Sequence, residues 1–186
     1  SGFRLGPLFT PQILSGTIMR PSVGGGANWS GAATDPETGI LYVPSVNAYS
    51  TIGLSPPQPE EEISTLNYLR RSLSAGPVMP RGLPLWKPPY SRITAIDMNT
   101  GDHAWMVPLG NGDRIRNHPR LRHLNLPPVG DGTISGVLLT KTLLISAVPT
   151  AGSDGGPGLI AWDKTTGEIQ GAVDLPAGTI GTPMTY

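Results

Sequence analysis

The stretch that decides the fold is "AIDMNTGDHAWMVPLG", residues 95–110, because the chain repeats it. Its counterpart is "AWDKTTGEIQGAVDLPAG", residues 161–178, in which an Ala, an Asp, a Thr and a Gly recur at an offset of 66. A weaker copy, "ATDPETGILYV" at residues 33–43, matches the Asp, Thr and Gly at an offset of 62. The shared element is Asp-x-x-Thr-Gly, with apolar residues before and after it.

This element predicts a β-hairpin. An Asp at the first turn position accepts hydrogen bonds from backbone N–H groups further along the turn, and a Gly supplies the positive φ that closes it. We therefore expect hairpins near residues 33–45, 93–109 and 159–176. A hairpin every 60–66 residues, with further strands between, indicates an all-β chain of repeated four-stranded sheets, which is a β-propeller. The 186 residues would supply about three blades.

Two long segments separate these hairpins, at residues 54–90 and 110–130. The first contains "EEEISTLNYLRRSL" (residues 60–73), in which acidic residues come first and arginines last. That order favours the helix dipole and predicts a short helix. Loops of this length in a compact β-protein are usually functional, as substrate walls, lids or contacts between chains.

Composition and charge narrow the function further. Gly and Pro number 25 and 21, the apolar residues come in short runs, and there is no Cys. The 13 basic residues balance the 13 acidic ones. The one basic cluster, "RIRNHPRLRH" at residues 114–123, has no aromatic residue to stack a base, so we interpret it as a solvated loop and expect no nucleic-acid partner. No apolar run is long enough to span a membrane.

Four segments together resemble the pyrroloquinoline quinone (PQQ)-dependent dehydrogenases: "GGANW", "DPETGILYVPS", "ITAIDMNTGDHAWMVPLGNG" and "LIAWDKTTGEIQGAVDLPAGTIGTPMTY". The segment "NGDRIRNHPRLRHLNLPPVG" is most similar to the glucose, quinate and shikimate branch. The resemblance covers nearly the whole chain. It implies that residues 1–186 form part of an eight-bladed propeller domain, from its C-terminal portion, and that other blades complete the ring.

The resemblance includes the tryptophan-docking motif of that family, Ala-x-Asp-x-x-x-Gly-x-x-x-Trp. Ala95, Asp97, Gly101 and Trp105 satisfy this motif completely. The resemblance implies that such a tryptophan lies between adjacent sheets, where its large area locks blades together. In the second copy Gly171 takes the tryptophan position, so we expect different packing there, with Trp162 on the neighbouring strand as the candidate.

The resemblance also assigns two cofactor contacts. Asn28 would hydrogen-bond the oxygens of PQQ, and Trp29 would line or cover its plane. Both roles suit an amide and an indole. The structural alternatives are an Asn that caps a turn and a Trp in the core or between blades. Gly24, Gly25 and Gly26 are not a phosphate loop, because no Lys-Ser/Thr follows; we expect close backbone approach near the propeller axis.

The chemistry implied by the resemblance is oxidation of a sugar, polyol or alcohol hydroxyl. A carboxylate takes the hydroxyl proton, hydride passes to PQQ, and a divalent cation, usually Ca²⁺, bridges PQQ and protein. We find neither this base nor the metal ligands among these residues and expect them in earlier blades. His103, His118 and His123 lack the spacing of a metal site. Asp97 and Asp163 are turn formers, and Asp131 is a minor candidate to face the axis.

Two other functions stay open from the sequence. The chain could be part of a non-catalytic propeller that binds protein partners, or an inactive truncated fragment. For the dehydrogenase we expect a periplasmic location, and a preceding region could supply a membrane anchor. Its partners would be the remaining blades, a sugar or alcohol substrate and an electron acceptor such as a quinone or a cytochrome.

Overall fold

The computed structural model describes residues 3–4, 6–59, 65–72, 80–179 and 181–186. The chain divides into two compact units, each made of two stretches of sequence. The first unit comprises Ser1–Gly25 and Ala48–Trp86, and the second comprises Gly26–Asn47 and Lys87–Tyr186. We describe each unit by itself.

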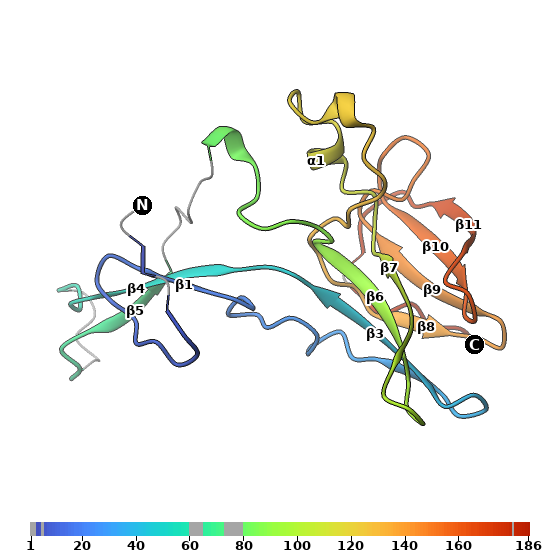
Figure 1. The fold of residues 1–186 in the computed structure, drawn as a ribbon, viewed down its shortest axis with the longest axis horizontal. Coiled ribbons are helices and arrows are strands. Elements are labelled where there is room, and N and C mark those ends of the chain that lie inside the picture. Colours follow the sequence, from blue (N-terminus) through green and yellow to red (C-terminus); the bar gives the residue numbers. More distant parts are fainter. Residues whose placement is uncertain (1–2, 5, 60–64, 73–79, 180) are drawn as a thin grey trace. The chain divides into compact units, whose positions relative to one another are not determined.

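The second unit contains two four-stranded antiparallel sheets (Figure 1). Sheet I has the order β2-β3-β6-β7 and is formed by β2 (Ala33–Asp35), β3 (Ile40–Val46), β6 (Ser91–Asp97) and β7 (His103–Pro108). Sheet II is a meander in which each strand pairs with the next, formed by β8 (Val137–Leu139), β9 (Leu143–Val148), β10 (Gly158–Asp163) and β11 (Ile169–Asp174). The all-β prediction is therefore confirmed.

Turn chemistry explains why the hairpins form where they do. Asp97 accepts the backbone N–H of Asn99 at 2.8 Å, and Asp163 accepts that of Thr165 at 2.8 Å. Gly101 and Gly167 follow at φ 82° and 75°, the left-handed region that glycine adopts without strain. These turns join β6 to β7 and β10 to β11, so the 66-residue offset relates equivalent hairpins of sheets I and II.

The weaker copy of the motif has a different place, which corrects the sequence interpretation. The turn after Asp35 joins β2 to β3, so it lies in the same sheet as the turn after Asp97. The offset of 62 therefore does not mark a separate blade. It is the number of sequence positions between the β2–β3 turn and the β6–β7 turn of sheet I. This number is large because residues 47–90 lie between β3 and β6.

Both sheets contribute to one buried cluster. Its largest member, Trp162, is 1% exposed. The other members are Tyr42, Ile93, Ala95 and Leu109, with Val137, Leu144, Val148 and Ile160. These residues alternate with less buried ones along β10, as expected for a strand with one face in a core. Trp162 thus packs in the cluster that sheets I and II share. The expectation that it takes the place of the tryptophan missing at Gly171 is therefore wrong.

The first unit is a smaller, three-stranded sheet. Its order is β1-β4-β5, from β1 (Thr17–Met19), β4 (Ser50–Ser55) and β5 (Leu69–Ser72). The helix expected over residues 60–73 is wrong where it can be checked, because Leu69–Ser72 is a strand that pairs with β4. Residues 60–64 and 73 lie outside the described residues. A 3₁₀ helix, η1 (Pro80–Gly82), follows.

Helices are few and short in the second unit as well. The segment between β7 and β8 contains α1 (Asp113–Arg116) and a 3₁₀ helix, η2 (Arg122–Leu124). Among the described residues, no helix has the length and apolar character needed to cross a bilayer.

Candidate functional site

The topology of sheets I and II separates short turns from long segments. The turns 36–39, 98–102, 140–142 and 164–168 all lie at one end of the strands, which we call the turn end. Residues 26–32, 109–136 and 149–157 lie at the opposite end, which we call the loop end. The chain also leaves the second unit after Asn47 and re-enters it at Lys87 at the loop end. Because loops carried by a rigid sheet usually hold functional residues, the loop end is the candidate site.

Asn28 and Trp29 lie at this loop end, directly before β2, the edge strand of sheet I. The backbone N–H of Val46 donates to the carbonyl of Gly26 at 2.7 Å, which ties this segment to the end of β3. The N–H of Gly31 donates to the carbonyl of Asn28 at 3.3 Å. Both side chains are exposed, and the Trp29 side chain is 90% exposed. Trp29 is therefore not a core residue of this chain, and the cofactor contact stays a prediction.

The residues 109–136 are fixed at their base by Asp131. Its carboxylate accepts the N–H of Gly112 at 2.6 Å, the N–H of Thr150 at 3.2 Å and the Thr150 hydroxyl at 2.7 Å. The amide of Asn111 adds a bond to the carbonyl of Thr150 at 2.9 Å. The role of Asp131 in the structure is thus to hold residues 109–112 against the loop that follows β9.

Trp105, the tryptophan of the docking motif, lies between the two sheets, nearer the turn end. Trp105 of β7 donates its indole N–H to the carbonyl of Lys164 at 3.1 Å, and the Tyr42 hydroxyl donates to the same carbonyl at 3.0 Å. The rings of Tyr42 and Trp105 are 5.7 Å apart, tilted by 40°. A Cβ added at Gly167 would lie 2.9 Å from the Trp105 ring. The prediction that Trp105 joins adjacent sheets is confirmed, and Gly167 provides the space for it.

An ion pair connects the sheets at the same place. The Lys164 ammonium binds the carboxylate of Asp35, which is 3% exposed. The Lys164 ammonium, together with the hydroxyl of Thr38, lowers the pKa of Asp35 from 3.8 to about 2. Burial, with the negative charges of Asp35 and Asp163 nearby, raises the pKa of Tyr42. Sequence reasoning missed Lys164, because no local pattern shows that a turn residue pairs with a carboxylate 129 positions away.

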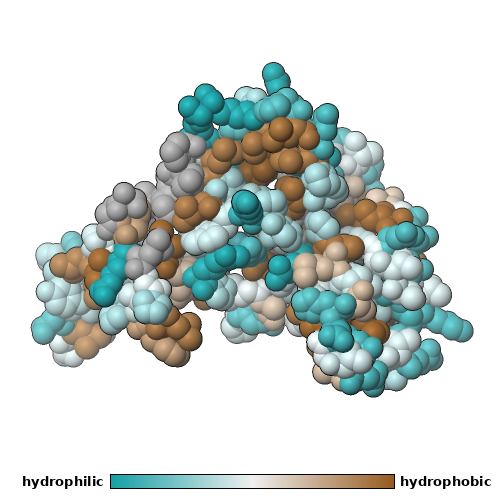
Figure 2. All heavy atoms as spheres, viewed as in Figure 1, coloured by the Kyte–Doolittle hydropathy of each residue, from teal (hydrophilic) through white to brown (hydrophobic). Residues whose placement is uncertain are grey.

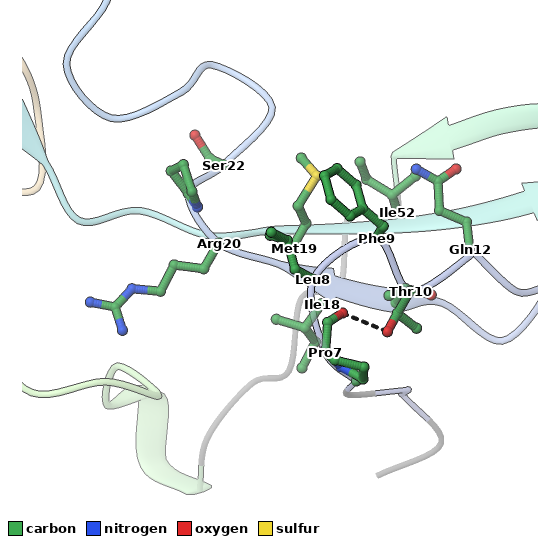
Figure 3. Close-up of a pocket in the computed structure, with 13 residues that line it drawn as sticks. Pro7, Leu8, Phe9, Thr10, Gln12, Ile18, Met19, Arg20, Ser22 and Ile52 are labelled. Carbon is green, nitrogen blue, oxygen red and sulfur yellow. Dashed lines mark hydrogen bonds between the residues drawn. The ribbon is translucent and has the colours of Figure 1, made fainter.

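The first unit contains a separate open cavity of about 570 Å³, shown in Figure 3. Its walls come from the N-terminal segment, including Pro7, Leu8 and Phe9, from β1 and the residues after it, and from Ile52 of β4. The guanidinium of Arg20, another lining residue, lies 5.3 Å from the ring centre of Trp86. The lining is mostly apolar.

A metal centre is not assembled within the described residues. They contain no group of three or more His, Asp or Glu side chains that could hold a metal ion. His103 lies on β7, whereas His118 and His123 lie in the segment between β7 and β8. The acidic turn residues serve local hydrogen bonds or, at Asp35, the pair with Lys164.

Comparison with known proteins agrees with this architecture. The family model for the PQQ glucose/ethanol/alcohol dehydrogenase β-propeller domain matches residues 1–186. The chain belongs to this family. Four-stranded sheets, as in the second unit of this chain, are the blades from which a β-propeller domain is built.

Individual members of the family are distant relatives. The probable quinate dehydrogenase (quinone) of Xanthomonas campestris pv. juglandis is 26% identical over 96% of this chain and 24% of its own length. The quinate/shikimate dehydrogenase (quinone) of Acinetobacter baylyi is 29% identical over the same shares. The crystal structure of a quinohemoprotein alcohol dehydrogenase from Comamonas testosteroni superposes with a TM-score of 0.56 at 19% identity. It covers 92% of this chain and 22% of that one, and the likeness shows the fold. The chain spans about a quarter of the length of these relatives.

Proposed function

We propose that this chain is a segment of a PQQ-dependent dehydrogenase that oxidises a hydroxyl group of a sugar, a polyol or a cyclic alcohol. The match of the whole chain to the PQQ dehydrogenase propeller family carries this proposal. The names of the relatives, which include quinate, glucose and glycerol dehydrogenases, support the class of substrate. The name quinate dehydrogenase (quinone) supports a quinone as the electron acceptor, with a cytochrome as the alternative.

Asn28 and Trp29 are the residues of this chain that we propose for cofactor contact. Their side chains are exposed at the loop end, next to each other and directly before β2. The NH₂ group of an amide can donate hydrogen bonds to quinone oxygens, and an exposed indole offers an apolar face to a planar ring. These properties fit PQQ. The Trp29 indole is 90% exposed, and the contact of its apolar surface with water costs free energy. A planar group that covers the indole would remove this cost.

PQQ, when bound, supplies the oxidising chemistry by accepting a hydride from the carbon that carries the hydroxyl. In this proposal Asn28 orients the quinone and Trp29 shields it from water. The base that takes the hydroxyl proton and the ligands of Ca²⁺ would come from other blades of the same protein. We also propose a periplasmic location, on the analogy of the quinoprotein dehydrogenases alone.

Reconstitution tests this function directly. The full-length protein that contains this sequence is mixed with PQQ and Ca²⁺, gel-filtered, and assayed for retained quinone absorbance and for dye-linked oxidation of quinate, glucose and glycerol. We expect retained PQQ and oxidation of at least one substrate. Absence of both from a folded protein would contradict the enzyme function and favour a propeller that only binds partners.

Two variants test the assigned contacts. Asn28→Ala and Trp29→Ala should each weaken PQQ retention by about tenfold, corresponding to roughly one or two lost contacts. The matched control is Met98→Ala, which removes an exposed apolar side chain at the turn end. If all three variants retain PQQ equally well, Asn28 and Trp29 do not contact the cofactor. The family assignment would not be affected by that result.

A further inference from the structure

One segment of this chain carries an excess of positive charge, although the whole chain has a formal net charge of zero. Residues 111–126, which we call the basic loop, hold four of the 13 Lys and Arg residues and one of the 13 Asp and Glu residues. The loop therefore carries a net charge of about +3, and the rest of the chain carries the opposite net charge. All four cations are arginines, whose planar group binds carboxylates through two parallel hydrogen bonds.

The basic loop is held rigidly by its own hydrogen bonds. Arg116 donates from Nε to the carbonyl of Leu126 at 2.9 Å and forms an ion pair with Asp113 at 3.3 Å. Ile115 is buried, and Asp131 holds the loop at its base. Backbone bonds such as that from the N–H of Leu121 to the carbonyl of His118, at 2.8 Å, close the turns between α1 and η2. These bonds fix the backbone from which the arginine side chains project, which lowers the entropy cost of binding.

Several cationic side chains of the loop face solvent. Arg114, Arg120, Arg122 and His123 are exposed, and Leu124 beside them is 53% exposed. Figure 2 shows hydrophilic residues at the top of the view over the segment between β7 and β8, with hydrophobic residues beneath them. The chain then continues into a shallow apolar groove of about 270 Å³, lined by Pro88, Pro89, Met106, Pro108, Pro127 and Pro128. A cationic surface therefore adjoins an apolar one.

The expected binding free energies decide which kind of partner suits the basic loop. At roughly 1 kcal/mol per arginine, a loop with a net charge of about +3 binds an anionic bilayer only weakly. Residues 109–131 contain no Trp, Tyr or Phe to anchor in the interface or to stack on a base. A protein surface requires less, because a few Arg–carboxylate pairs suffice to orient a partner and to speed its association.

We propose that the basic loop and the adjoining groove form a docking surface for an acidic protein partner. Arg120 and Arg122 bind Asp or Glu side chains of the partner, and the groove receives an apolar side chain next to them. Leu124 extends the apolar contact between the two regions. The surface includes neither Asn28 nor Trp29, and the proposal does not depend on the cofactor.

A defined acidic peptide tests the proposal. The probe is a fluorescent peptide of about twelve residues in which glutamates flank one central Leu, and its anisotropy is followed with the full chain. We expect binding that weakens at least about tenfold from roughly 20 to 200 mM NaCl, as for exposed charge pairs. Arg120→Gln with Arg122→Gln should weaken it about tenfold, and Arg120→Lys with Arg122→Lys about threefold, because the charge stays but the paired hydrogen bonds are lost.

The matched control is Lys141→Gln, which removes an exposed cation at the turn end. We expect it to change the affinity for the peptide less than twofold. All variants lie at exposed positions, so equal melting temperatures would show that they fold. Equal binding by the Arg120/Arg122 variants and the wild type would overturn the proposal. So would tighter binding of the chain to vesicles of phosphatidylglycerol or to single-stranded RNA than to the peptide.

Discussion

The ammonium group of Lys164 binds the carboxylate of Asp35, although the two residues are 129 positions apart and belong to different sheets. Lys164 lies in the turn between β10 and β11, and Asp35 ends β2. The backbone carbonyl of the same lysine accepts the hydrogen bonds of Tyr42 and Trp105, both from sheet I. One turn residue of sheet II therefore contacts three side chains of sheet I, and it forms a polar connection between the sheets.

Lys164→Met should destabilise the chain. The substitution leaves the nearly buried carboxylate of Asp35 with only the Thr38 hydroxyl and the Glu37 N–H as donors, and an uncompensated buried charge is unfavourable. Urea unfolding followed by tryptophan fluorescence should give a lower midpoint for Lys164→Met. The double variant that combines Lys164→Met with Asp35→Asn should recover part of this decrease in the midpoint. Lys141→Met, in the neighbouring exposed turn of sheet II, is the control and should unfold as the wild type does.

The carboxylate of Asp35 also makes the stability of the folded chain depend on pH. The pKa of Asp35 is about 2 in the folded chain and 3.8 when it is unperturbed. Its contribution is therefore complete above about pH 4 and is lost as the pH falls from there through about 2. Unfolding midpoints measured from pH 6 to pH 2.5 should decrease in this range, and less steeply in Asp35→Asn. The hydroxyl and the N–H of Ser153 also lower the pKa of Asp174. Because Asp174 is present in both proteins, the difference between their slopes reports on Asp35 alone. An identical slope would show that the pair with Lys164 does not persist in solution.

The local turn chemistry of this chain could be predicted, because a hydrogen bond two residues along the chain is encoded within a few positions. The bonds from the N–H groups of Asn99 and Thr165 to the Asp carboxylates before them are of this kind. The motif also predicted the place of Trp105 between sheets. It could not show which sheet a turn belongs to, because the sequence Asp-x-x-Thr-Gly closes the β2–β3 turn as well as the β6–β7 turn.

Contacts between distant segments explain the other differences between the sequence prediction and the structure. The segment around Arg70 and Arg71 has the charge order of a helix, yet pairing with Gly53 and Leu54 of β4 makes it a strand. Tertiary pairing overrides a local preference worth only tenths of a kcal/mol per residue. At the candidate site the sequence selected Asn28 and Trp29 through a family resemblance, and the structure adds that both are exposed at the loop end. Their contact with a cofactor stays a prediction.

Gly167→Ala should cost more stability than the same change at the equivalent position of sheet I. Gly101 and Gly167 have φ values of 82° and 75°, so an alanine is strained at both, by about 1 kcal/mol. A Cβ at Gly101 has nothing within 4 Å, whereas one at Gly167 would lie 2.9 Å from the Trp105 ring. We expect Gly167→Ala to lose about 1–3 kcal/mol more in urea unfolding. Equal losses would mean that Trp105 does not pack on this turn.

Asp131→Asn should loosen the loop end and leave the turn end unchanged. The carboxylate accepts hydrogen bonds at both oxygens from Gly112 and Thr150, whereas an amide keeps only one accepting oxygen. The loss should be about 1–2 kcal/mol, expressed as faster amide hydrogen exchange in residues 109–112 and at Thr150. The control is Asp154→Asn, since Asp154 accepts the N–H of Gly156 within its own exposed turn. Exchange that rises equally at the turn end would show that Asp131 supports the whole sheet pair instead of its loops.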